Sequence, residues 1–320
     1  MNTYFNILLY CAAVFIAASG CETATTVKES SFMMGTVVEI TVEHKDTAKA
    51  RRIIGQAIHE GKRIEKLLDV YDENSEVSKI NHRAGIEGVK VSDDVCQVIE
   101  KALYYGKLSG GAFDITIEPL LELWGFGKGE KRIPGKEEIE RVLPLIDYRK
   151  VAVNRQGKTV KLIEKGMKIN LGAIAKGYIV DRMVSFMKEN GIEMALVNAG
   201  GDIYASGSPK GTTSWKIGVR NPRNSQGVKE IISIRDRGIA TSGDYEKYFL
   251  MNGKRYSHII DPRTGYPASG VISVTVIAET AQAADALATA LFVLGERRGK
   301  ELADSLEGVE AVFVASEEKM

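Results

Sequence analysis

Segments with strand periodicity and segments with helix periodicity alternate along this chain, without the regular strand–helix–strand rhythm of a parallel sheet. Strands are predicted in pairs, for example at residues 151–153 with 159–163 and at residues 215–219 with 231–235. Strand pairs with helices interleaved between them favour two packed layers rather than a doubly wound sheet. The sequence therefore predicts an α+β fold with largely antiparallel sheets and packed helices.

The helical segments place apolar residues three and four positions apart, which gives each one a buried face. Helices are predicted over residues 50–68, residues 95–103 after a cap at Ser92, residues 176–190 and residues 284–292. Further strands are predicted at residues 37–42, 195–198, 271–278 and 309–314. No repeat and no low-complexity linker follows residue 30, so residues 31–320 are predicted to form one domain.

The N-terminus differs from the rest of the chain. Residues 7–16 are an apolar run, too short to span a membrane comfortably, and small residues follow it up to Cys21. Small residues directly before a Cys are typical of a bacterial lipoprotein signal, although no Lys or Arg precedes Lys28. We predict a signal peptide at residues 1–20, lipidation of Cys21 and a polar tether at residues 21–30. A plain cleaved signal and an uncleaved anchor remain the alternatives.

Composition excludes several classes of protein. The formal net charge is +1, so nothing suggests a face that binds nucleic acid. Phosphate-binding loops, dinucleotide fingerprints and serine-hydrolase motifs are absent, and no two of the four His have the spacing of zinc ligands. Once Cys11 leaves with the signal and Cys21 is lipidated, only Cys96 remains, which we interpret as a small buried apolar residue.

Glycine-bearing polar segments stand at the predicted ends of strands. Residues 170–177 precede a helix, where glycines and free N–H groups suit an anion and Lys176 can meet a phosphate. An ordinary turn with an exposed Lys is the alternative. Residues 197–202 run from a strand into a Gly-Gly turn, which permits close contact with a ring or a pyrophosphate but serves equally for a bulge.

Two further features carry oxygen and nitrogen ligands. Asp285 and Thr289 are four residues apart on the last helix and share one face, where they can bind a hard cation such as Mg²⁺. The alternative is a solvated Asp285 with Thr289 bonded to its own helix. His258 precedes an Asp-Pro-Arg-Thr-Gly turn, and a lone His is more often structural than a catalytic base.

Taken in order, these motifs resemble the ApbE family, the FAD:protein FMN transferases, over roughly residues 31–315. The markers include residues 34–36, Tyr71 with residues 75–81, residues 111–114, residues 170–177, residues 198–202, residues 241–243, residues 258–265 and residues 285–289. The resemblance implies a flavin transferase catalytic domain at residues 31–320 with an ApbE-like, T-fold-like architecture. Asn170 departs from the family pattern, in which acidic residues are frequent at that position.

The resemblance also implies roles for single residues. Flavin contacts are expected from Met34, Tyr71, Ala112, Phe113, Asp114, Asn170, Lys176 and Ile259. The magnesium ligands are expected to be the Ala173 carbonyl, Asp285 and Thr289. His258 is the candidate general base, with Asp244 or Asp261 as alternatives, and Lys176 is expected to stabilise charge on the phosphates. An aromatic residue at position 71 favours transfer over FAD hydrolysis.

The resemblance implies transfer of FMN from FAD to a Thr or Ser hydroxyl of an acceptor protein, with release of AMP and a requirement for Mg²⁺. Expected acceptors are subunits of the sodium-pumping NADH:quinone reductase (Nqr) and related (Rnf-like) membrane redox complexes. The enzyme is then exported, anchored by its lipid and faces the periplasm. The alternatives are an Mg²⁺-dependent FAD pyrophosphatase and a flavin-binding storage lipoprotein. A role in thiamine synthesis finds no support in these residues.

Overall fold

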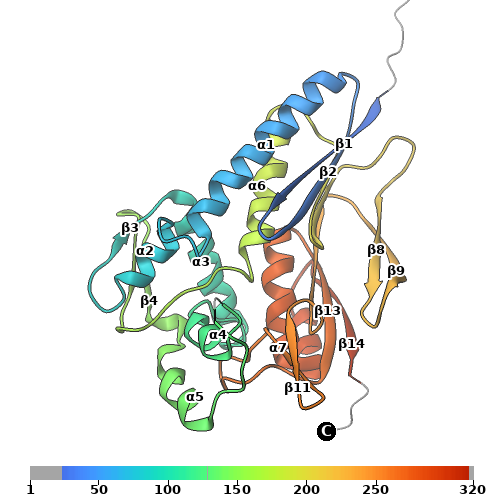
Figure 1. The fold of residues 1–320 in the computed structure, drawn as a ribbon. Coiled ribbons are helices and arrows are strands. Elements are labelled where there is room, and N and C mark those ends of the chain that lie inside the picture. The colour runs from blue at the N-terminus through green and yellow to red at the C-terminus, as the bar shows by residue number, and fades with distance from the viewer. Residues whose placement is uncertain (1–23, 128, 317–320) are drawn as a thin grey trace, which may run out of the picture.

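The computed structural model describes residues 24–127 and 129–316 (Figure 1). Its centre is a seven-stranded sheet in which every neighbouring pair is antiparallel. In spatial order the strands are β1 (Thr25–Met33), β2 (Thr36–His44), β6 (Ala195–Ala199), β7 (Asp202–Ser206), β10 (Arg237–Gly243), β13 (Val271–Ala278) and β14 (Glu310–Ala315). The predicted α+β fold with antiparallel sheets is confirmed.

Three long helices cover one face of this sheet: α1 (Thr47–Leu68), α6 (Ala175–Glu189) and α7 (Ala281–Asp304). Figure 1 shows α1 and α6 side by side, with α7 beside β13 and β14. Alternate residues of β2, from Val38 to Val42, are fully buried against these helices, as strand periodicity requires. The last helix extends well past the predicted residue 292, and Gly295 interrupts its helical backbone with a φ of 76°.

A hairpin covers part of the opposite face of the sheet. It consists of β8 (Trp215–Asn221) and β9 (Asn224–Ile234). The apolar cluster between hairpin and sheet contains Ile203, Ala205, Trp215, Ile217, Ile234, Ile239 and Ile277. The central sheet is therefore buried on both faces along β10 and β13, which explains why every residue of β13 is buried.

A second lobe packs beside the sheet and appears at the lower left of Figure 1. Its helices are α2 (Glu76–His82), α3 (Asp93–Leu108), α4 (Glu118–Trp124) and α5 (Lys136–Val142). Its small sheet joins β3 (Val89–Lys90), β5 (Thr159–Leu162) and β4 (Val151–Asn154), next to 3₁₀ turns at Leu143–Leu145 and Tyr148–Lys150. The hairpin of β11 (Tyr248–Met251) and β12 (Lys254–Ser257) packs on this lobe through Trp124.

Two predictions about local structure are confirmed by direct contacts. The Ser92 hydroxyl accepts a hydrogen bond from the backbone N–H of Val95 and caps α3. Cys96 is buried on that helix and forms no disulfide. Within the described part of the chain, no helix is both long and apolar enough to cross a membrane.

One prediction near the N-terminus was wrong. The tether was assigned to residues 21–30, but residues 25–30 belong to β1 and pair with β2. The polar composition of this segment misled the assignment, because an edge strand of a half-covered sheet keeps most of its side chains in solvent. Only Val27 and Met33 of β1 are buried. The predicted signal peptide, residues 1–20, and Cys21 lie outside the described residues.

Candidate active site

A cavity of about 470 Å³ opens between the central sheet and the second lobe, within the size range of small-molecule sites. Every predicted site residue within the described part of the chain lines it. These residues are Met34, Tyr71, Ala112, Phe113, Asp114, Asn170, Ala173, Lys176, His258, Ile259, Asp285 and Thr289. Segments as far apart in the sequence as Met34 and Thr289 thus meet at one site, as the resemblance implies.

One wall of the cavity is formed where α6 and α7 approach each other. A Cβ atom at Gly177 would lie 2.3 Å from the carbonyl oxygen of Ala281, so only glycine permits this contact. The close approach lets the Asp285 carboxylate accept a hydrogen bond from the Gly177 N–H, with Oδ2 and N 3.1 Å apart. One turn later on α7, the Thr289 hydroxyl lies 3.2 Å from the Ser242 hydroxyl of β10.

The charges on this wall form a compact group. Lys176 is ion-paired with the buried Asp202 carboxylate. Burial lowers the pKa of Lys176, but the carboxylates of Asp202 and Asp285 outweigh burial and raise the pKa above its ordinary value. Burial and then the charge of Asp202 raise the pKa of Asp285, which is 4% exposed, to about 7. Two carboxylates thus face one ammonium group, which leaves a deficit of positive charge.

The residues on this wall fit a hard divalent cation. Asp285 and Thr289 line this wall together with Ala173. Their carboxylate and hydroxyl, with the Ala173 backbone carbonyl, are oxygen groups of the kind that could hold such a cation, and positive charge there would offset the carboxylates. No group of three or more His, Cys, Asp or Glu in the described residues could hold a metal ion. A site with so few protein ligands suits a cation that completes its shell with phosphate and water, as Mg²⁺ commonly does.

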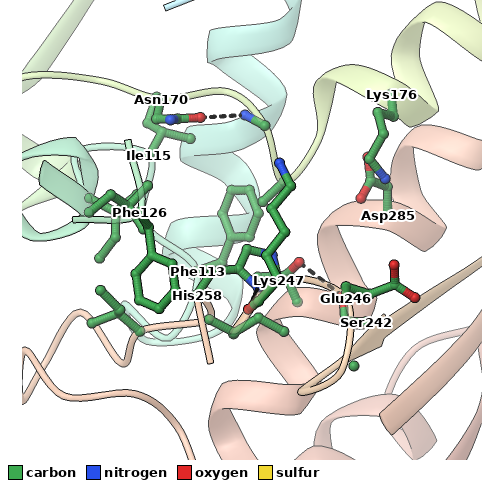
Figure 2. Close-up of a pocket in the computed structure, with 18 of the residues that line it drawn as sticks. Phe113, Ile115, Phe126, Asn170, Lys176, Ser242, Glu246, Lys247, His258 and Asp285 are labelled. Carbon is green, nitrogen blue, oxygen red and sulfur yellow. Dashed lines mark hydrogen bonds between the residues drawn. The ribbon is translucent and has the colours of Figure 1, made fainter. Parts of the chain in front are cut away.

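The opposite wall is aromatic and apolar. Figure 2 shows Ile115, Phe126 and Asn170 across the cavity from Lys176 and Asp285, with Phe113 between them. The backbone of Met34, with a φ of 54°, donates a hydrogen bond to Glu65 Oε1 at 2.5 Å, which fixes the chain as it enters β2. A flat, largely apolar ligand can pack against this wall.

Asn170 belongs to a hydrogen-bonded network on the apolar wall. Its Oδ1 accepts from the Gly172 N–H at 2.8 Å, and its Nδ2 donates to Glu118 Oε2 at 2.6 Å. Glu118 is 2% exposed at the start of α4, and burial raises its pKa to about 7. Burial and then the charge of Glu118 also raise the pKa of Tyr71 to about 12. A carboxyl group from α4 therefore lies directly beside Asn170.

The Asp114 carboxyl group has a structural task, although the residue lines the cavity. Its two oxygens accept hydrogen bonds from the Thr116 N–H at 2.8 Å and the Tyr148 N–H at 2.9 Å. These bonds hold the turn that follows Ala112 and Phe113, both of which are buried. The predicted flavin contact of Asp114 stays a prediction. Both oxygens of its carboxylate already accept hydrogen bonds from the protein backbone.

His258 is the one candidate base that reaches the cavity. The Lys247 carbonyl accepts hydrogen bonds from the His258 N–H at 2.9 Å and from its Nδ1 at 3.0 Å. Because a carbonyl only accepts, Nδ1 carries the proton and Nε2 is the basic atom. Burial and then the charge of Lys247 lower the pKa of His258 to about 4, so the ring is neutral at pH 7.

The two alternative bases lie elsewhere. Asp244 accepts hydrogen bonds from Arg223 at 2.9 Å and Arg255 at 3.2 Å, and Asp261 accepts from Arg263 at 2.8 Å. Neither carboxylate is among the described residues that line the cavity. Arg223 belongs to the turn between β8 and β9, Arg255 to β12, and Arg263 follows Asp261 in the same turn. These ion pairs indicate a structural role for both aspartates.

Sequence reasoning missed several residues of the cavity. Ser242, Glu246 and Lys247 line it without having been predicted as site residues, and Glu118 stands directly behind it. Ser242 lies within the motif at residues 241–243, so the sequence indicated that this segment belongs to the family pattern. It gave no sign that the Ser242 hydroxyl contacts Thr289. Glu118 gave no signal, because its position depends on how α4 packs against residues 170–172.

The cavity combines one wall that fits a cation, a lysine that can bind phosphate and a second, aromatic wall. This combination is typical of an enzyme that acts on a nucleotide-like phosphate ester. A sequence model of the ApbE family matches residues 34–313. The chain therefore belongs to the ApbE family.

Individual relatives agree with this assignment. The FAD:protein FMN transferase of Treponema pallidum is 32% identical over 96% of this chain and 90% of its own length. The FAD:protein FMN transferase of Klebsiella pneumoniae is 36% identical over 89% of this chain and 88% of its own length. The crystal structure of the ApbE protein from Thermotoga maritima superposes with a TM-score of 0.84 at 39% identity, covering 91% of this chain and 94% of that one. Flavin transferase ApbE from Vibrio cholerae gives a TM-score of 0.81 at 32% identity, with the same coverage.

Proposed function

We propose that this protein transfers FMN from FAD to a Thr or Ser hydroxyl of an acceptor protein and releases AMP. The observation that carries the proposal is the convergence of Lys176, Asp285 and Thr289 on one wall of a cavity whose other wall is aromatic. A flavin dinucleotide offers a pyrophosphate to the first wall and flat rings to the second. The relatives named FAD:protein FMN transferase support the same reaction.

The reaction balances without a further reactant. The acceptor oxygen forms a bond to the phosphorus of the FMN half, and the bond from that phosphorus to the bridging oxygen breaks, so that AMP leaves. The hydroxyl proton passes to a base and then to AMP or solvent. Lys176, held by Asp202 at the start of α6, stabilises the negative charge that grows on the phosphate oxygens.

We assign the Ala173 carbonyl, Asp285 and Thr289 as ligands of a magnesium ion. When bound, the ion supplies Lewis-acid stabilisation of charge on the diphosphate. The chain itself contributes the orientation of these ligands: Gly177 brings α6 against α7, and the Gly177 N–H holds the Asp285 carboxylate. Ser242 holds the Thr289 hydroxyl from the adjacent strand.

His258 is assigned to accept or steer the acceptor proton, since its Nε2 is unprotonated and the residue lines the cavity. The substitution His258→Ala tests this role. We expect the transfer rate to fall at least about 100-fold, the usual contribution of a general base, with FAD affinity retained. A variant that binds FAD and transfers FMN at the wild-type rate rules out the role.

The function itself is tested with purified protein, FAD, MgCl₂ and a candidate acceptor, a subunit of the sodium-pumping NADH:quinone reductase. Mass spectrometry is expected to find one FMN added to a Thr or Ser of the subunit. Rapid AMP release without acceptor, and no modified subunit, would establish the FAD pyrophosphatase instead. Tight FAD binding without turnover and without an effect of Mg²⁺ would establish a storage protein.

The location of the enzyme follows from the same proposal. An exported protein, anchored through a lipid on Cys21 and facing the periplasm, would meet acceptor subunits of membrane redox complexes at the membrane surface. The substitution Cys21→Ala is expected to move the protein from the membrane fraction to the soluble fraction. Retention of the variant in the membrane fraction would refute the lipid anchor.

A further inference from the structure

A second cavity of about 440 Å³ adjoins the first on the hairpin side of the central sheet. One side is formed by Val37 and Glu39 of β2, and the other by β8 from Ile217 to Val219. Ile203 and Ile239 form its floor. We call this cavity the lateral groove. The two cavities share Thr36, Gly200, Thr241 and Glu246, so they are continuous.

The continuity arises from a recess in the sheet. β7 pairs with β10 only from Arg237 to Ile239, and β10 continues beyond that to Gly243. On the other side, β2 begins at Thr36, before its first pair with β6 at Val38. The turn between β6 and β7 is formed by two glycines and therefore lies set back between the projecting ends of β2 and β10.

Glycine is required at this recess. Gly200 has a φ of 62°, and a Cβ atom there would lie 2.5 Å from the Thr36 hydroxyl oxygen. A side chain at this position would therefore clash with Thr36 and fill the connection between the two cavities. The Gly-Gly turn keeps open a route from one face of the sheet to the other.

The recess leads directly to the candidate cation site. Successive side chains of a strand point to opposite faces, so Thr241 faces the lateral groove while Ser242 faces α7. The Ser242 hydroxyl lies 3.2 Å from the hydroxyl of Thr289, an assigned magnesium ligand. A group that enters along the groove as far as Thr241 therefore arrives beside the site where the diphosphate is expected.

We propose that the lateral groove binds an extended segment of the acceptor protein and delivers its Thr or Ser hydroxyl through the recess. This inference rests on the proposed transferase function, in which FAD occupies the first cavity. In phosphoryl transfer the nucleophile and the leaving group are roughly in line, so the acceptor must approach from the side away from AMP. The lateral groove is continuous with the first cavity, so it offers the acceptor a separate route to the bound FAD.

The chemistry of the groove favours an extended segment with apolar and small side chains. Beyond Ile239, the edge of β10 is not paired with β7 and can bond the backbone of an added strand. At the outer end, Phe32 and Val37 are cross-strand partners on the uncovered face of β1 and β2. They are 70% and 53% exposed, an apolar pair that suits residues flanking the acceptor hydroxyl.

The test uses Val37→Arg and Phe32→Arg in the full-length protein, because both side chains are exposed and neither substitution disturbs the core. The matched control is Ile86→Arg, an equally apolar residue, 62% exposed, in the second lobe. The rate of FMN transfer is measured at increasing concentrations of the acceptor subunit, with the mass-spectrometry assay described above. FAD affinity and acceptor-independent AMP release are measured in parallel. We expect the KM for the acceptor to rise at least about tenfold in the two groove variants, with the FAD measurements unchanged.

The possible results separate the groove proposal from the transferase proposal. Wild-type KM for the acceptor in both groove variants overturns the groove but leaves the transferase standing. Loss of FAD affinity in the groove variants, without loss in Ile86→Arg, also overturns it, since the flavin would then occupy the groove. A wild-type enzyme that modifies no acceptor overturns the transferase and the groove together. As an independent measurement, a photo-crosslinking amino acid at position 37 is expected to capture the acceptor subunit, and one at position 86 is not.

Discussion

The two walls of the active-site cavity hold buried carboxyl groups in different surroundings. Asp285 lies beside the carboxylate of Asp202 and the ammonium of Lys176, whereas Glu118 lies against the amide of Asn170. Both carboxyl groups have a pKa of about 7. For Asp285, a neighbouring negative charge adds to burial, and a cation would relieve it. For Glu118, burial dominates, and the more distant Glu122 and Lys168 act in opposite directions.

Burial is the largest cause of the raised pKa on both walls, and the walls differ in what adds to it. On the first wall the charge of Asp202 adds to the effect of burial, and a divalent cation can offset that charge. On the second wall the cause is removal from water, which a cation would leave unchanged. The following substitutions separate the two causes.

The largest effect is expected from Asp285→Asn. Loss of one assigned cation ligand should lower the single-turnover rate of FMN transfer by about 10²- to 10³-fold, comparable to removal of one preorganised electrostatic group. MgCl₂ is expected to raise the melting temperature of the wild-type protein, because the cation binds the folded state, and this rise should disappear in the variant. Glu118→Gln serves as the control and should retain that rise. Undiminished stabilisation by Mg²⁺ in Asp285→Asn would move the cation away from this wall.

Lys176→Met should reduce both activity and stability. Transfer is expected to fall about 100-fold, because the phosphate loses its ammonium partner. Stability should fall by up to about 3 kcal/mol, since Asp202 is left buried and unpaired. In the double variant with Asp202→Asn, stability should recover while activity stays low. Recovery of activity together with stability would show that Lys176 serves only the fold.

Glu118→Gln should alter how stability depends on pH. The pKa of Glu118 in the folded protein, about 7, lies above its ordinary value of 4.5, so folding favours the protonated form. Its contribution is fully present below about pH 4.5 and is lost as pH rises through 7. Glutamine stays neutral, so at pH 8 the variant should be more stable than wild type, by on the order of 2 kcal/mol. At pH 5 the two should be nearly equal, as urea unfolding at both pH values will establish; equal stability at pH 8 contradicts the assignment.

The smallest effect is expected from Tyr71→Asn. The ring of Tyr71 lines the apolar wall, and its loss should admit water to the bound diphosphate. We expect the ratio of AMP released by hydrolysis to FMN transferred to rise several-fold, measured by chromatography of AMP and mass spectrometry of the acceptor. Tyr104→Asn, an exposed tyrosine of α3, is the control and should leave the ratio unchanged.

Much of the fold was predictable because its signals are local. The apolar spacing of α1 and α3, the Ser92 cap and the alternation in β2 each depend on residues within a few positions of one another. β1 was missed for the same reason. An edge strand in this position needs few apolar residues, and its pairing with β2 cannot be read from its composition.

The candidate site divides in the same way. The resemblance to the ApbE family placed Lys176, His258, Asp285 and the aromatic residues at one site, and all of them line one cavity. The choice among His258, Asp244 and Asp261 could not be made from the sequence, since each is a polar residue near a turn. Arg223 and Arg255 engage Asp244, and Arg263 of the same turn engages Asp261, whereas His258 lines the cavity.

The sequence by itself determined the type of most elements, the membership of the site and the presence of an i, i+4 carboxylate and hydroxyl on α7. Only the tertiary structure decided the charge state of the buried carboxyl groups, the support of Asn170 by Glu118 and the recess that joins the two cavities. Periodicity and turn chemistry act over a few residues. Burial, the hydrogen bond between Asn170 and Glu118 across 52 positions of the sequence, and the unequal lengths of paired strands exist only after distant segments have packed together.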